Sequence, residues 1–146
     1  MPSAAIIAEY SYRDFDGTIL YQKLRYAPKH FIQRRPTGPD TWTADLEGVQ
    51  RVIYRLPELK DRHAIVWCEG EKDVDAAWAL GIPATCGHEG AGVWRSYFGE
   101  QLIAQGVRRV AILPDNDVPG RAHATAIAEG LHHLGLEARI VALPNL

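Results

Sequence analysis

Two short acidic motifs in this chain of 146 residues each follow an apolar run. The first, residues 69–73 (EGEKD), follows residues 64–68 (AIVWC), and the second, residues 115–117 (DND), follows residues 109–113 (RVAIL). If the two runs are neighbouring strands, carboxylates about 5 Å apart would repel by roughly 3 kcal/mol per ionised pair at an effective dielectric near 20. Such a cluster needs a cation, and a few oxygen ligands favour Mg²⁺ or Mn²⁺ over zinc.

The candidate metal ligands in these motifs are four carboxylates, Glu69, Asp73, Asp115 and Asp117. Asp115 and Asp117 are two residues apart, so an extended strand end points both side chains to one side. Asp73 follows Glu69 by four residues, so the first turn of a helix brings it toward the same edge. The alternative is that these acids are ordinary helix caps and turn residues, where Asp and Glu are common.

A third acidic motif, residues 14–20 (DFDGTIL), resembles the nucleophile motif of haloacid-dehalogenase-type phosphatases. In that family the motif follows a buried parallel strand, whereas residues 9–13 (EYSYR) are polar and alternating, as in a β-hairpin. The phosphatase is the main competing enzyme class. An EF-hand beginning at Asp115 is excluded, because Pro119 and Ala126 stand where oxygen ligands are needed.

Composition excludes several broad classes of protein. Apolar residues make up 47% of the chain and the net charge is −2, which is unlike a disordered protein. No run approaches eighteen apolar residues, and no basic stretch precedes an apolar segment at the N-terminus, so we expect a cytoplasmic protein. Cys68 and Cys86 are too few for a disulfide framework, and buried thiols are a commoner role for them than a soft metal site with His88.

The pattern of the chain changes near residue 62. Residues 1–62 hold ten Lys or Arg against eight Asp or Glu, and residues 63–146 hold six against ten. In the first part we expect a hairpin of residues 6–12 with 18–26 and a short strand, 31–35, ended by the loop 36–40. Another brief strand, 52–54, and a helical turn, 56–59, should follow. In the second part strands alternate with helices, which predicts a mainly parallel sheet with its ligands beyond the carboxyl ends of the strands. The expected strands are 64–68, 82–86, 109–113 and 138–143, and the expected helices are 71–80, 94–105 and 121–134.

A basic segment with interleaved aromatic residues lies in the first part. Residues 23–35 contain five Lys or Arg and no acid, together with Tyr26, His30 and Phe31. Such a segment suits an enzyme that acts on a polyanion. The alternative is a solvated strand face.

Residues 65–73 (IVWCEGEKD) and 111–120 (AILPDNDVPG) resemble the defining motifs of the TOPRIM domain. That metal-binding fold is shared by bacterial-type primases, type IA and II topoisomerases and some nucleases. The EGExD motif and the glycine-rich loop after residues 81–84 (GIPA) are most similar to primase-helicases of phages, plasmids and integrated elements. The resemblance implies an α/β, Rossmann-like TOPRIM domain over residues 63–146, with a mainly parallel four-stranded sheet and flanking helices. A small antiparallel β-rich lobe over residues 1–62 would precede it.

The resemblance also implies roles for individual residues. Glu69 would be the general acid/base or a metal ligand, Asp115 and Asp117 would bind Mg²⁺ or Mn²⁺, and Asp73 would support them. Five basic residues would contact nucleoside triphosphates or template phosphates: Lys29, Arg34, Arg35, Lys72 and Arg95. The implied activity is nucleotidyl transfer on a DNA template in replication of a mobile element.

Some features of the family are missing from the chain. It has no cysteine-rich zinc module and no P-loop, and Val93 stands where relatives commonly have Lys, a position for which Arg95 is a candidate substitute. We therefore expect the chain to be incomplete on its own, with helicase or zinc-module chains as partners. A non-catalytic nucleic-acid- or partner-binding module, a TOPRIM nuclease and the phosphatase remain the alternatives.

Overall fold

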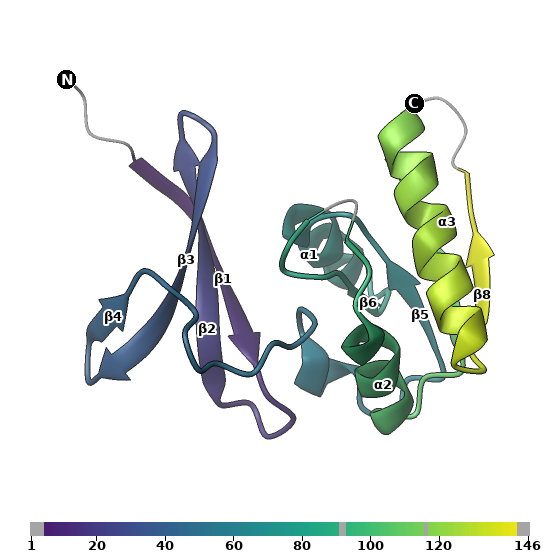
Figure 1. Ribbon diagram of the computed structural model, residues 1–146, viewed down its shortest axis with the longest axis horizontal. Coiled ribbons are helices and arrows are strands. Elements are labelled where there is room, and N and C mark those ends of the chain that lie inside the picture. Colours follow the sequence, from purple (N-terminus) through teal and green to yellow (C-terminus); the bar gives the residue numbers. More distant parts are fainter. Residues whose placement is uncertain (1–4, 91–92, 116, 143–146) are drawn as a thin grey trace. The chain divides into compact units, whose positions relative to one another are not determined.

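The computed structural model describes residues 5–90, 93–115 and 117–142 (Figure 1). The chain forms two compact units, residues 1–51 and 52–146. The first unit is an antiparallel sheet with strand order β1-β2-β3-β4. Its strands are β1 (Ala5–Arg13), β2 (Ile19–Ala27), β3 (His30–Gly38) and β4 (Thr41–Thr43). The antiparallel β-rich architecture expected at the start of the chain is confirmed.

The loop expected at residues 36–40 is shorter than the sequence suggested. Strand β3 continues through Pro36, which pairs with Trp42 of β4 next to a shift in register. A proline lacks only its own N–H, and a strand end or bulge tolerates that loss. The turn itself is confined to residues 39–40, where Asp40 has a positive φ of 61°. The expectation that residues 36–40 end the strand was therefore wrong, and β3 and β4 form a further hairpin after β1–β2 and β2–β3.

The phosphatase-like motif lies in the turn between β1 and β2. The Asp14 Oδ1 atom accepts hydrogen bonds from the backbone N–H groups of Asp16 (3.1 Å) and Thr18 (3.2 Å). Hydrogen bonds with Asp14 and Thr18 lower the pKa of the Asp16 carboxyl to about 2. These acids organise a hairpin turn. Because β1 pairs antiparallel with β2, the buried parallel strand that the phosphatase alternative requires does not precede Asp14.

The second unit is built on a parallel sheet with strand order β6-β5-β7-β8. The strands are β5 (Ala64–Trp67), β6 (Ala84–Thr85), β7 (Arg109–Ile112) and β8 (Glu137–Ile140). The helices are α1 (Glu71–Ala79), α2 (Ser96–Ala104) and α3 (Val118–His133). The expected alternation of strands and helices around a four-stranded parallel sheet is confirmed. Helices α2 and α3 contact each other. With this strand order, the right-handed crossovers that parallel strands adopt place these two helices on one face of the sheet and α1 on the other.

Individual elements differ from the expected ones mainly at their ends. Strand β6 has only two residues, and α3 begins three residues earlier than expected because the Asp117 side chain caps it. Strand β8 ends at Ile140, and the expected last strand residue, Leu143, lies outside the described residues. None of the described helices is long and apolar enough to cross a membrane.

Residues 52–62 belong to the second unit, so the compact units divide at residue 51 and not at the expected residue 62. The Ile53 backbone N–H donates to the Gln101 side chain (2.9 Å), and the Tyr54 N–H donates to the Cys86 carbonyl (3.0 Å). Residues 52–54 are therefore a buried segment without regular secondary structure and not the expected strand. The helical turn expected after them is present as the short 3₁₀ helix η1 (Leu56–Leu59), and Gln105 donates to the Leu56 carbonyl (2.7 Å).

Candidate functional site

The carboxyl ends of β5 and β7 lie side by side. Trp67, the last residue of β5, is paired with Ile112, the last residue of β7, and the Leu113 N–H donates to the Trp67 carbonyl (2.9 Å). The segments that follow these two strands therefore leave the sheet at the same edge. Glu69 lies on the first segment and Asp115 on the second.

The start of α3 brings the acidic residues close together around Gly120. A methyl group on Gly120 would lie 2.4 Å from the Asp115 carbonyl oxygen, 2.8 Å from Asp117 Oδ1 and 3.0 Å from Glu69 Oε1. Only a residue without a Cβ atom leaves room for these three oxygens. Gly120 closes the motif 111–120 in the sequence, but no role for it followed from the pattern, although a glycine in the first turn of a helix behind acidic residues signals close approach of other groups.

Asp117 has a structural role as well as a place in the acidic cluster. Its Oδ1 atom accepts a hydrogen bond from the Gly120 backbone N–H and so caps α3, while its own N–H donates to the Asp115 carbonyl (2.8 Å). The alternative hypothesis, that these acids are ordinary helix caps, is thus correct for one oxygen of Asp117. Asp115 is exposed and is not a cap.

The environment of Glu69 opposes its ionisation. Burial raises the pKa of the Glu69 carboxyl to about 7, with further contributions from a hydrogen bond with Asp115 and from the charges of Asp115 and Asp117. The Glu69 Oε1 atom is buried and has no hydrogen-bond partner within the described part of the chain. The structure therefore brings together Glu69, Asp115 and Asp117, and their action as ligands or catalysts stays a prediction.

Asp73 stays a predicted ligand, and its observed interaction is with Cys68. It is exposed in the first turn of α1, and its charge acts on Cys68, whose thiol pKa is raised to about 12 by burial and then by Asp73. Across residues 5–90, 93–115 and 117–142, no group of three His, Cys, Asp or Glu side chains is arranged to hold a metal ion. This also applies to Cys68, Cys86 and His88, which are all buried.

The basic residues selected from the sequence fall into two groups. Arg34 pairs with Glu9 (3.3 Å), Arg35 pairs with Asp45 (2.7 Å), and Arg95 pairs with Glu89 through two nitrogens at 3.1 and 2.9 Å. Their guanidinium groups are already engaged within the protein. In contrast, Lys29 in the β2–β3 turn and Lys72 in the first turn of α1 are exposed.

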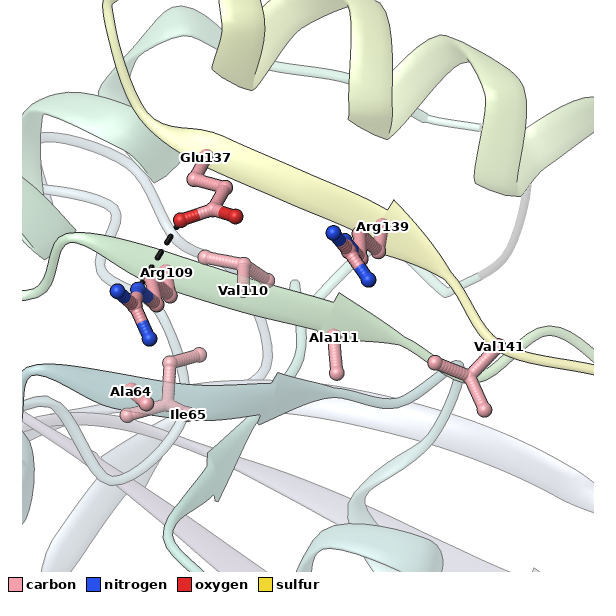
Figure 2. Close-up of a pocket in the computed structure, with 8 residues that line it drawn as sticks. All are labelled: Ala64, Ile65, Arg109, Val110, Ala111, Glu137, Arg139 and Val141. Carbon is pink, nitrogen blue, oxygen red and sulfur yellow. Dashed lines mark ion pairs between the residues drawn. The ribbon is translucent and has the colours of Figure 1, made fainter.

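A hollow on one face of the parallel sheet is separate from the acidic cluster. It has a volume of about 380 Å³, and the side chains that line it come from β5, β7, β8 and the residue after β8 (Figure 2). Arg109 and Glu137 form an ion pair across neighbouring strands at 3.0 Å (Figure 2). None of the residues selected from the sequence lines this hollow.

The raised pKa of Glu69 predicts how stability depends on pH without divalent metal. The carboxyl binds its proton more tightly in the folded state (pKa about 7) than at its ordinary value of 4.5. Between these values the folded protein holds more protons, so stability falls as pH rises from about 4.5 to 7. We expect Glu69→Gln to flatten this dependence by about 1 kcal/mol, because solvent screens a partly exposed group. Urea unfolding in EDTA across this pH range measures the slope, and an unchanged slope in the variant would contradict the assignment.

The comparisons with known proteins agree with a primase-type fold. No protein-family model matches the chain. The gene 57 protein of Mycobacterium phage D29 is 41% identical over 77 residues, which are 53% of this chain and 46% of that protein. The chain thus spans about half the length of this curated relative.

Two solved primase structures share the fold over almost the whole chain. The primase fragment of the bacteriophage T7 primase-helicase has a TM-score of 0.61 and 20% identity, covering 93% of this chain and 53% of that one. The Aquifex aeolicus primase, with its zinc-binding and RNA polymerase domains, has a TM-score of 0.69 and 19% identity, covering 92% of this chain and 33% of that one. Because more than nine-tenths of the chain is covered in both cases, the likeness includes β-strands from the first unit as well as the parallel sheet.

Proposed function

We propose that this chain is the TOPRIM domain, with its preceding β-rich lobe, of a primase-type replication protein from a phage or a related mobile element. Its activity would be Mg²⁺-dependent nucleotidyl transfer on a DNA template. The observation that carries the proposal is the meeting of Glu69 with Asp115 and Asp117 beyond neighbouring parallel strands. The likeness of the fold to two primases and the similarity to a phage protein support the same conclusion.

The acidic cluster has the chemistry that a divalent cation requires. Glu69 Oε1 is buried without a hydrogen-bond partner among the described residues, and the neighbouring carboxylates oppose its ionisation. A cation would relieve both conditions. Mg²⁺ is usually held by one or two carboxylates together with waters and substrate phosphates, so Glu69 and Asp115 would suffice, with Asp117 as a further ligand. Once bound, the cation would neutralise charge that develops on the phosphates during transfer.

The protein's own residues would complete the chemistry. If Glu69 is not itself a ligand of the cation, its partly buried carboxyl, whose pKa is raised, would be the general acid/base. Asp117 would hold α3 in place through its cap and so keep Gly120 against the cluster. Lys29 and Lys72, which are exposed, would supply positive charge for template or triphosphate phosphates.

A binding module without catalysis is the second candidate function. Two observations favour it: one oxygen of Asp117 is engaged in capping α3, and no group of three side chains among the described residues is arranged to hold a metal. In that case the same fold would hold nucleic acid or a partner protein, with helicase or zinc-module chains as candidate partners.

A primer-synthesis assay tests the proposal. The chain, alone and with candidate partner chains, is incubated with single-stranded DNA of mixed sequence, labelled nucleoside triphosphates and Mg²⁺ or Mn²⁺. We expect short labelled products whose yield falls at least about 100-fold in Glu69→Gln, since acid/base catalysis contributes about 10²–10⁴-fold. Asp14→Asn serves as the control, because Asp14 lies in the β1–β2 turn, and it should leave the yield unchanged.

Other outcomes separate the alternatives. Metal-dependent nicking of plasmid that is lost in Glu69→Gln, with no primer formed, would identify a nuclease. Nucleic-acid binding with neither activity, with and without partner chains, would identify the binding module. Hydrolysis of a small phosphate ester that depends on Asp14 and not on Asp115 would restore the phosphatase.

A further inference from the structure

The β2–β3 hairpin presents an exposed aromatic ring beside basic side chains. Phe31 on β3 is 43% exposed and stands directly opposite Arg25 on β2. Opposite residues of an antiparallel pair project from the same face of the sheet. The Arg25 guanidinium lies 6.0 Å and the Lys23 ammonium 4.8 Å from the centre of the Phe31 ring. Lys23 is itself buried (7% exposed) and Arg25 is half-buried, so the exposed part of this group is the Phe31 ring with the Arg25 side chain beside it.

Some basic side chains of the first unit form ion pairs with acids of the same unit. Arg34 is held by Glu9 and Gln22 and lies 4.2 Å from the Trp42 ring, and Arg35 is held by Asp45. No acid occurs between residues 17 and 39. On the face of Phe31, the residue opposite Arg25 on the other neighbouring strand is Ala8. Arg25 is half-buried, its Nε atom is buried without a hydrogen-bond partner among the described residues, and its guanidinium lies beside the Phe31 ring. Lys29 is exposed in the turn that joins the two strands, two positions before Phe31, and no acid stands in this segment.

We propose that Arg25, Lys29 and Phe31 form a binding surface for single-stranded nucleic acid, which we call the hairpin surface. An unpaired base would stack on the Phe31 ring, while Arg25 and Lys29 would neutralise flanking phosphates. A duplex is a poorer fit, because its bases are already stacked on one another and cannot cover the ring. The inference deepens the proposed function by naming the residues that hold a template strand, and this binding needs no metal.

Fluorescence anisotropy of a labelled single-stranded DNA of about 20 nucleotides, titrated with the protein in EDTA, tests the stacking contact. We expect Phe31→Ala to weaken binding about tenfold, as base–aromatic stacking contacts do. Phe31→Trp should bind at least as tightly as the wild type. Phe15→Ala is the matched control, because Phe15 is equally exposed (47%) in the same unit but lies in the β1–β2 turn. It should bind like the wild type.

The salt dependence of binding tests the cationic contacts. Each phosphate contact with a single strand contributes about 0.7 to the slope of log K against log salt concentration. Arg25→Gln and Lys29→Gln should each lower the slope by about that amount. Lys60→Gln removes the same charge from an exposed position in the second unit and should leave the slope unchanged. A similar loss in Lys60→Gln would indicate diffuse electrostatic binding and overturn the proposal.

Several results would contradict the hairpin surface. These are wild-type affinity in Phe31→Ala, an equal loss in Phe15→Ala, or an equal effect of Phe31→Ala on a duplex of the same sequence. Phe31→Leu keeps an apolar side chain on the sheet and removes the aromatic face, so it should lose affinity even if Phe31→Ala folds poorly. Glu69→Gln should bind the strand normally. The two proposals can therefore fail separately. If Glu69→Gln binds the strand and still makes primers, the proposed metal site is wrong and the hairpin surface is unaffected. If Phe31→Ala binds the strand like the wild type, the hairpin surface is wrong and the proposed function is unaffected.

Discussion

Replacing Asp115 by Asn is expected to abolish the stabilisation of this protein by Mn²⁺ or Mg²⁺. A ligand that binds only the folded state at about 100 times its Kd adds about 2.7 kcal/mol, which raises the Tm of a chain of this size by roughly 5–10 °C. Asp115 is exposed, makes no helix cap and interacts directly with Glu69. Without its charge the cation loses a ligand, so the shift should fall close to zero.

The same variant should behave in the opposite way without metal. Asp115 contributes to the raised pKa of Glu69, so removing its charge relieves repulsion at neutral pH. Metal-free Asp115→Asn should therefore be at least as stable as the wild type. Thermal unfolding with and without the metal measures both effects in one experiment.

Two control variants identify the source of the metal shift. Asp117→Asn keeps a residue that caps helices well, so it tests the charge of Asp117 separately from its structural role. Asp14→Asn changes an acid of the β1–β2 turn and should leave the metal shift intact. Equal melting shifts in the wild type and in a variant carrying both Asp115→Asn and Asp117→Asn would rule out the metal site.

Replacing Gly120 by Ala is expected to destabilise the protein and disrupt the acidic cluster together. The added methyl group would lie 2.4 Å from the Asp115 carbonyl oxygen, a backbone atom that cannot rotate away as a side chain does. Overpacking of this kind costs about 1–3 kcal/mol, and a loss near the upper end would lower the Tm by roughly 5–10 °C. Elsewhere in a helix the same substitution is stabilising, so the sign of the effect is informative.

Gly70→Ala provides the matched control for this prediction. Gly70 also lies at the start of a helix beside the cluster, but a methyl group there meets no atom within 4 Å. Its substitution should change the free energy of unfolding by less than about 1 kcal/mol. If Gly120→Ala keeps both the wild-type Tm and the wild-type metal shift, the close approach of Asp115 and Glu69 to α3 is not the constraint described above.

Local patterns in the sequence were sufficient to predict the parallel sheet and the edge on which the acids meet. Apolar strands separated by helices imply parallel pairing, and parallel strands end at a common edge. Glu69 and Asp115 could therefore be expected to approach each other although 46 positions separate them. Gly81, Gly106 and Gly135, all with positive φ, likewise marked where helices end.

Long-range partners decided the features that the sequence did not predict. Residues 52–54 look like a strand, yet the hydrogen-bond acceptor for the Ile53 N–H is the side chain of Gln101, 48 positions away. The basic segment 23–35 looks uniform, yet Glu9, 25 positions from Arg34, holds that guanidinium, whereas Arg25 lies beside the Phe31 ring. Local propensity carries no information about such partners.

For the acidic cluster too, some features could be predicted from the sequence and others depend on the tertiary structure. The types and spacing of its residues came from the sequence, because the chemistry of carboxylates and the geometry of strand ends are local properties. The need for Gly120, the cap made by Asp117 and the buried environment that raises the pKa of Glu69 arise only where α3 meets the edge of the sheet. Distances and burial depend on the packing of distant segments, so only the tertiary structure determines them.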